Sequence, residues 1–181
     1  MDGAATLSLH GLEVSMPALI SVRRAQPQGI DWDSIAQELG IEFPNDYMAL
    51  SEFYPGLVID DWLAIQCPRA GSEGRFVDFV KREAARVAGL RDAGMTRGYV
   101  PYPEESGLVP WADSIDGDVL HFRTSPKGGD HWTVVVSSCN DDWCEFEGGS
   151  TAYLSGLASG HIASHVLPPD FPGPNPGVFC G

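Results

Sequence analysis

The sequence is poor in basic residues and has no long hydrophobic run. Its 11 Lys and Arg stand against 25 Asp and Glu, which gives a formal net charge of -14 at pH 7. Phosphate backbones and anionic lipid surfaces would repel such a chain, so we expect no direct nucleic-acid partner. No stretch reaches the ~18 consecutive apolar residues that a membrane-spanning helix needs. We therefore also expect no membrane association.

Cysteine and early positive charge are scarce as well. The chain has four cysteines at irregular spacing, too few for a disulfide scaffold, which predicts reduced thiols. Asp2 and Glu13 lie near the N-terminus, where a secretory signal peptide carries positive charge. These features predict a cytoplasmic protein.

The motifs of the most easily recognised enzyme classes are missing too. The sequence contains no Gly-rich phosphate loop, no dinucleotide-binding fingerprint and no Gly-x-Ser-x-Gly nucleophile turn. Their absence excludes these classes, so any catalysis would depend on side chains that only the fold could bring together.

The composition is that of one folded domain with an uneven charge distribution. With 181 residues, 43% hydrophobic and 10% aromatic, the chain can bury a single core. Residues 69–99 hold seven bases and four acids, whereas the segments on either side are strongly acidic. In the base-rich segment, Phe76, Val80, Ala84 and Val87 recur at steps of three and four, which predicts an amphipathic helix.

Periodicity and turn residues predict the remaining elements. Asp31 or Asp33 is expected to cap a first helix that Gly40 ends, Pro44 begins a second, and Ser150 or Thr151 is expected to cap the last one. We expect helices over residues 30–39, 44–54, 73–93 and 150–159, and strands over residues 57–59, 62–65, 99–102, 108–112, 118–123, 132–137 and 141–146.

The two ends of the chain have sequence patterns of their own. Leucines spaced through residues 7–14 favour a strand, and residues 18–22 a second one, although Pro17 interrupts them. From Pro168 onward, five prolines in nine residues predict an extended, polyproline-like arm that packs along the body or hangs free.

Three groups of side chains are candidates for chemistry. Two thiolates and two imidazoles suit zinc, and Cys139, Cys144, His161 and His165 supply them, but the predicted helix between the pairs opposes a compact site. Closely spaced carboxylates at positions 113, 116 and 118 resemble the start of a calcium loop without its downstream Glu. His121 and His131, with Asp118 or Asp130, form a minimal acid–base set only if neighbouring strands bring them together.

The segment from Asp141 to Glu147 combines acidic and aromatic residues. Trp143 and Phe146 supply apolar anchors, and the carboxylates around them would attract a basic protein surface. An acidic edge strand that prevents aggregation has the same composition, and the two interpretations are compatible.

Several short motifs occur in an order that resembles the SUKH superfamily, which contains bacterial immunity proteins and a fungal regulator of cell-wall synthesis. The start of one predicted helix is similar to the Leu-Pro-x-Asp-Tyr helix start of the superfamily and consists of Phe43, Pro44, Asp46 and Tyr47, with Phe in place of the usual Leu. Residues 109–112 and 117–122 look like its Ile-Pro-Phe-Ala and Gly-Asp strands, and Tyr153 and Leu154 look like its final helix.

The resemblance implies an α+β fold, a single domain with helices packed on a twisted, mostly antiparallel sheet. It covers residues 30–160 and leaves residues 1–29 as an N-terminal extension and residues 161–181 as a proline-rich C-terminal arm. It also implies a protein that is not an enzyme and has neither catalytic residues nor a cofactor. The expected function is that of an immunity protein that binds and neutralises a basic bacterial toxin domain, for which a nuclease is the expected class. A scaffold or regulatory protein of the cell-wall type and, behind it, a small zinc-dependent hydrolase are the alternatives. Our own choice of contact residues is Asp60, Asp61, Trp62, Asp141, Asp142, Trp143, Glu145 and Glu147.

Overall fold

A seven-stranded sheet forms the centre of the computed structural model, which describes residues 3–162 and 165–180. The strand order is β6-β5-β4-β3-β2-β1-β7, and each neighbouring pair is antiparallel. The strands are β1 (Leu57–Ile59), β2 (Leu63–Ile65), β3 (Leu108–Ser114), β4 (Val119–Arg123), β5 (Thr133–Ser137), β6 (Trp143–Phe146) and β7 (Val178–Cys180). The expected acidic edge strand is therefore β6.

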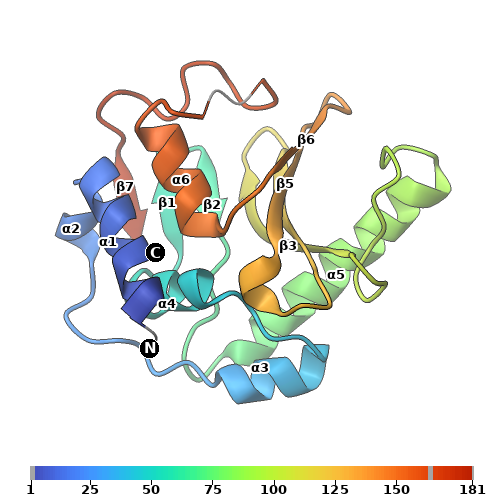
Figure 1. Cartoon of the computed structure of the whole chain (residues 1–181), viewed down its shortest axis with the longest axis horizontal. Helices are drawn as coiled ribbons and strands as arrows, with labels where there is room; N and C mark the ends of the chain where they lie inside the picture. The colour runs from blue at the N-terminus through green and yellow to red at the C-terminus, as the bar shows by residue number, and fades with distance from the viewer. Residues whose placement is uncertain (1–2, 163–164, 181) are drawn as a thin grey trace.

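Six helices pack against this sheet and against one another (Figure 1). Helix α1 contacts α4 and α6, whereas α5 contacts β3 and α3. The helices are α1 (Gly3–Ser15), α2 (Leu19–Val22), α3 (Trp32–Leu39), α4 (Asn45–Phe53), α5 (Glu73–Asp92) and α6 (Ser150–Ala158), and a short 3-10 helix spans Gly129–His131. The chain is an α+β domain, as the sequence predicts. Within the described residues, no helix is long and apolar enough to cross a membrane.

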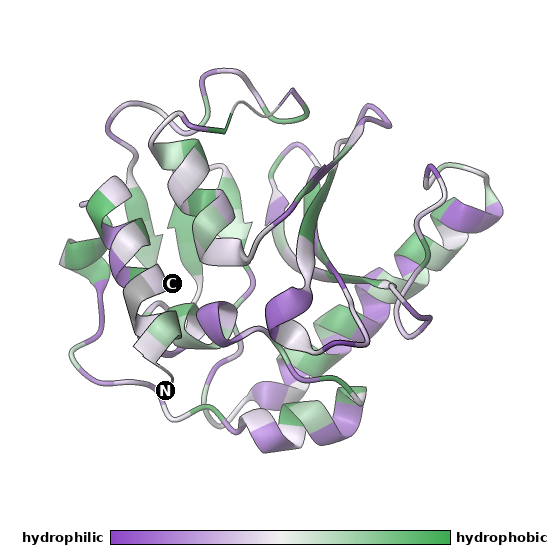
Figure 2. Ribbon diagram, in the orientation of Figure 1, coloured by the Kyte–Doolittle hydropathy of each residue, from purple (hydrophilic) through white to green (hydrophobic). Residues whose placement is uncertain are grey.

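Strand alternation divides the buried side chains into two clusters. Val134 and Val136 of β5 face the large core, which also contains Tyr47 of α4 and Phe122 of β4. Val135, between them, faces the other side and packs with residues of α5 and β3 in a small second cluster. Figure 2 shows the corresponding distribution, with hydrophobic strands at the centre and alternating hydrophobic and hydrophilic positions along α5.

Local signals explain the helices that the sequence predicts. The Asp31 carboxylate caps α3 by accepting from Ser34 N at 2.9 Å, and Gly40 ends it with φ = 68°. Helix α4 begins directly after Pro44. In α5, Phe76, Val80 and the other apolar positions of the stripe are buried, which confirms the amphipathic helix.

Three local predictions are wrong. Residues 3–15 and 19–22 form helices rather than strands, because Leu9, Leu12 and Met16 bury one helical face in the large core. The strand expected at residues 99–102 is absent from the described elements and is replaced by turns with an isolated bridge between Pro101 and Leu108. Prolines at positions 101 and 103 lack the N–H groups that a strand ladder requires.

The cap of α6 differs from the expected one. Neither Ser150 nor Thr151 caps the helix with its own side chain; Gly149 is the N-cap residue and makes no side-chain cap bond. Instead, the carboxylate of Asp46, on α4, accepts from Thr151 N at 2.8 Å and from the hydroxyls of Ser150 and Thr151 at 3.0 Å. A residue distant in sequence therefore satisfies the first turn of α6.

The C-terminal arm packs along the body. It ends in β7, which pairs with β1 and places Val178 in the large core. The carboxylate of Asp60 accepts from Gly173 N at 2.9 Å and from Gly177 N at 2.7 Å. The segments on both sides of residues 30–160 thus contribute to the same sheet and core as that central region.

Candidate functional site

Three turns meet at one end of the sheet. They connect β1 to β2 (residues 60–62), β3 to β4 (residues 115–118) and β5 to β6 (residues 138–142), and all lie at the top in Figure 1. Ile115 N donates to Trp62 O at 3.0 Å, and Cys139 N donates to Asp118 Oδ1 at 3.1 Å, so each turn is bonded to the next. We call these three turns the turn end.

The turn end carries six aspartates with different environments. Asp118 is only 4% exposed and accepts from Ser114 Oγ at 2.7 Å, and Asp60 holds the C-terminal arm. Asp141 pairs with Arg97 at 3.0 Å. The other three, at positions 61, 116 and 142, are exposed. All six contribute negative potential, but only the exposed carboxylates are readily available to a partner.

Hydrophobic groups are exposed next to these carboxylates. Ile115 is 77% exposed at the tip of the β3–β4 turn, and Met95, which follows α5, is 47% exposed. Trp62 is half-buried: its Nε1 donates to Asp116 Oδ2 at 2.7 Å and its ring packs on Phe171 at 4.6 Å between centroids. Sequence reasoning did not single out Ile115, although an isolated Ile inside an Asp-, Ser- and Gly-rich turn indicates an exposed apolar side chain.

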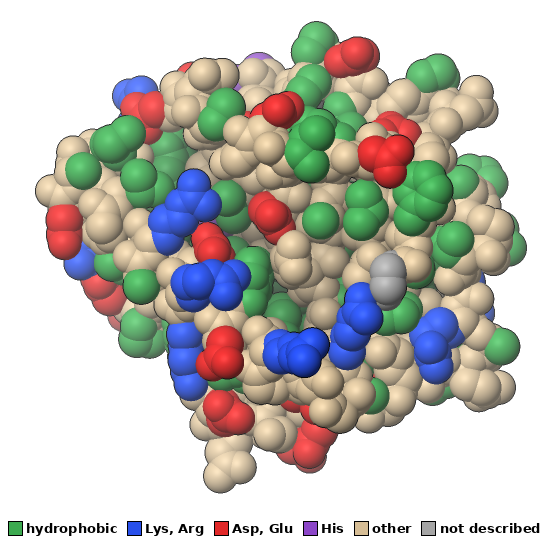
Figure 3. Space-filling model, turned by 180° about the vertical axis from the view of Figure 1, so that it is seen from behind, with side chains coloured by type: hydrophobic (Ala, Val, Ile, Leu, Met, Phe, Trp, Pro, Cys, Tyr) green, Lys and Arg blue, Asp and Glu red, His purple; other side chains and the backbone are tan. Residues whose placement is uncertain are grey.

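Figure 3 shows the distribution of charge on the molecule seen from behind. Acidic and hydrophobic side chains occupy the upper rim, and most of the basic side chains gather below it. Several bases belong to α5, including Arg75, Lys81, Arg82 and Arg86, all of which are exposed. The negative charge of the chain is therefore not spread evenly over its surface.

The contact residues chosen from the sequence fall into two groups. Asp60, Asp61, Trp62, Asp141 and Asp142 lie on the turn end, at opposite sides of the β3–β4 turn that bridges them. Trp143 and Glu145 lie on the outer strand β6 instead, and Glu147 comes directly after it.

Two of the β6 residues are engaged inside the domain. Trp143 stacks on Tyr99 at 5.2 Å and on His121 at 6.2 Å between ring centroids. The Glu145 carboxylate accepts from Thr133 Oγ1 at 2.6 Å and from Arg123 Nη1 at 3.1 Å. Burial opposes ionisation of Glu145, but these hydrogen bonds outweigh it and lower the pKa of the carboxyl. Glu147 is exposed beyond the end of β6.

A cavity of about 260 Å³ lies beside the turn end, between the second half of α5 and the β5–β6 hairpin. His121 lines it and is 2% exposed, with Nε2 at 3.1 Å from Ser137 Oγ. Burial, with a smaller contribution from the nearby Arg86 charge, lowers the pKa of His121 from 6.5 to about 3. The imidazole is therefore neutral at physiological pH.

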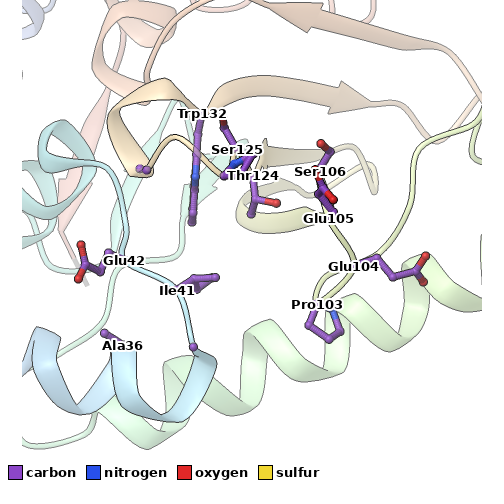
Figure 4. Close-up of a pocket in the computed structure, with 14 residues that line it drawn as sticks. Ala36, Ile41, Glu42, Pro103, Glu104, Glu105, Ser106, Thr124, Ser125 and Trp132 are labelled. Atoms are coloured by element: carbon purple, nitrogen blue, oxygen red, sulfur yellow. The ribbon is translucent and has the colours of Figure 1, made fainter.

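A second, larger cavity of about 510 Å³ lies near the opposite end of the sheet (Figure 4). Trp132 and Ile41, which follows α3, line one side of it, and Pro103 and Ser106 line the other. Glu42, Glu104 and hydroxyl side chains supply polar groups, but Glu104 is paired with Arg91. This cavity contains no histidine or cysteine among its lining residues.

The chemical groups suggested by the sequence are dispersed. Cys139 is exposed in the β5–β6 turn, Cys144 packs against the large core from β6, and His161 and His165 are exposed beyond α6. Across residues 3–162 and 165–180, no three His, Cys, Asp or Glu side chains are grouped so that they could hold a metal ion.

The other two groups are not assembled either. Asp113, Asp116 and Asp118 accept hydrogen bonds from three different residues, Gln66, Trp62 and Ser114. His131 is exposed in the 3-10 helix, whereas His121 is buried on β4. Asp130 bonds to Asn45 rather than to a histidine.

Comparisons of the chain with protein-family models, with curated proteins and with solved structures found no match.

Proposed function

We propose that this chain is a non-catalytic protein-binding domain that uses the turn end to bind a basic partner protein. The observation that carries the proposal is the concentration of six aspartates around the exposed Ile115 on one end of the sheet. Many protein interfaces have an apolar centre with charged groups around it. The carboxylates would accelerate the encounter with a basic surface, and Ile115 would supply apolar surface that becomes buried on binding.

The class of partner follows from charge and from the resemblance to the SUKH superfamily. A nuclease must present a basic surface to its phosphate substrate, so an acidic protein can occupy that surface. Together with the immunity proteins of the superfamily, this favours a bacterial toxin with nuclease activity, neutralised by direct binding in the cytoplasm.

Capture from the cells that produce the protein tests the partner class. We expect the tagged chain to retain one basic protein that elutes as salt rises, that is toxic when expressed alone, and whose toxicity disappears on co-expression with this chain. Several non-toxic regulatory partners would favour a scaffold instead and would contradict the immunity function.

Charge variants test the surface itself. Replacing the exposed Asp61, Asp116 and Asp142 by Asn should slow association with the captured partner about tenfold at low salt and much less at high salt. The matched control replaces three exposed acids elsewhere, Glu42, Asp78 and Glu105, by their amides. Both triple variants change the net charge equally, so an equal slowing would remove the turn end as the binding site.

A further inference from the structure

The 260 Å³ cavity is built from the same elements as the turn end. Asp116 and Asp141, from two of the three turns, line it together with Trp143 of β6 and Leu90 of α5. The partly exposed Met95 also lines it. A protein bound at the turn end would therefore lie next to this cavity.

The size of the cavity suits one side chain better than a metabolite. Small-molecule sites have volumes of about 300–1,000 Å³, and this cavity is smaller, at about 260 Å³. Its lining includes the apolar side chains of Val87, Leu90 and Met95. Pockets of this kind in protein interfaces are filled by Trp, Tyr or Arg side chains, which dominate binding energy.

One side chain of the cavity lining, His121, has a polar atom without a hydrogen-bond partner. Among the described residues, Nδ1 of His121 is buried and makes no hydrogen bond. The Ser137 hydroxyl donates to Val119 O, so it accepts from Nε2–H of His121, which leaves Nδ1 as an acceptor without a donor. Buried acceptors are normally satisfied, and an incoming N–H or O–H group would satisfy this one.

We propose that this cavity receives the side chain of a Trp or Tyr of the basic partner, which buries its ring against Leu90 and Met95 and donates its N–H or O–H to Nδ1 of His121. This inference rests on the proposed function, since it supplies the apolar anchor for a partner that the carboxylates attract. The charges would then control the association rate of the partner, and the filled cavity would control its dissociation rate.

Two matched probes test the cavity in the isolated chain. 3-Methylindole reproduces the Trp side chain, and 1,3-dimethylindole differs from it by lacking the N–H donor. By NMR titration, we expect 3-methylindole to shift the signals of Trp143 and His121, and 1,3-dimethylindole to bind at least about fivefold more weakly. The variant His121→Phe should abolish this difference. Equal binding of the two probes, no shift at these residues, or tighter binding of n-propylguanidinium, which reproduces Arg, would overturn the proposal.

A second test uses the complex with the captured partner. Leu90→Trp fills the cavity and should make the complex dissociate about tenfold faster with little change in association. The control Ala85→Trp places the same side chain at an exposed position of α5 and should change neither rate. If the aspartate variants slow association but Leu90→Trp leaves dissociation unchanged, the anchor cavity is refuted while the proposed function stands. If no partner is found, the indole titration still decides whether the cavity binds such a group.

Discussion

Acid should destabilise this protein partly through His121. In the folded state its pKa is lowered from 6.5 to about 3, first because the ring is buried and second because of the Arg86 charge. In the unfolded chain the imidazole returns to its ordinary pKa. Between these two values the unfolded state binds a proton that the folded state does not, so the free energy of unfolding falls as pH is lowered.

The size of the effect follows from the two pKa values. The contribution of His121 to the free energy of unfolding is nearly complete above pH 6.5. Below pH 6.5 it decreases by about 1.4 kcal/mol for each pH unit. Between pH 7 and pH 5 the fold should therefore lose about 2 kcal/mol through this one group. That loss is a large fraction of the 5–15 kcal/mol that typically separates folded from unfolded proteins.

Urea unfolding at pH 7 and at pH 5, followed by tryptophan fluorescence, measures this loss. The variant His121→Phe keeps a ring beside Trp143 but cannot titrate. Other groups titrate equally in both proteins, so the wild type should lose about 2 kcal/mol more than the variant. The control is His131→Phe, which removes an exposed histidine and should retain the pH dependence of the wild type. Parallel losses in the wild type and His121→Phe would show that His121 is not held neutral by the fold.

Three further predictions concern the contacts that hold the fold together. Asp46→Ala removes the acceptor for Thr151 N and two hydroxyls and should cost about 2–3 kcal/mol in urea unfolding, with a smaller loss for Asp46→Asn. Asp60→Ala frees two amides of the C-terminal arm, and hydrogen exchange in β7 should become at least about tenfold faster. Gly129→Ala would place a Cβ 2.8 Å from Glu42 O, so we expect a loss of about 1–3 kcal/mol by thermal or urea unfolding.

A specific result would contradict each of these three predictions. Equal stability of Asp46→Ala and the wild type would mean that water caps α6 as well as the carboxylate does. Unchanged exchange in β7 would show that the arm is held by its apolar contacts alone. A fully stable Gly129→Ala variant would mean that the turn before β5 relaxes away from the segment between α3 and α4 at little cost.

Elements with local signals were predictable from the sequence. Asp31 and Gly40 mark both ends of α3, because a cap and a left-handed terminus depend on neighbouring residues only. The helix over residues 73–92 follows from a sustained apolar repeat. The N-terminal helices were missed because a few leucines at spacings of two and three fit both a strand and a helix.

The other predictions failed because the features concerned depend on contacts between residues that are distant in sequence. Asp46 caps α6 from more than a hundred residues away, which no local pattern reveals. The choice of Asp60 and Trp62 as contact residues recognised their chemistry but not that the C-terminal arm already engages them. Glu145 similarly bonds to residues of β4 and β5.

The sequence by itself determined the acidic character of the protein, most of its helices and strands, and the aspartate-rich turns, because composition and short-range periodicity contain that information. Only the tertiary structure decided which turns meet. The order of strands in the sheet gathers residues 60–62, 115–118 and 138–142 at one end and surrounds Ile115 with carboxylates. The cavity beside them also required the packing of α5 on β3, since its walls come from segments that only the folded chain brings together.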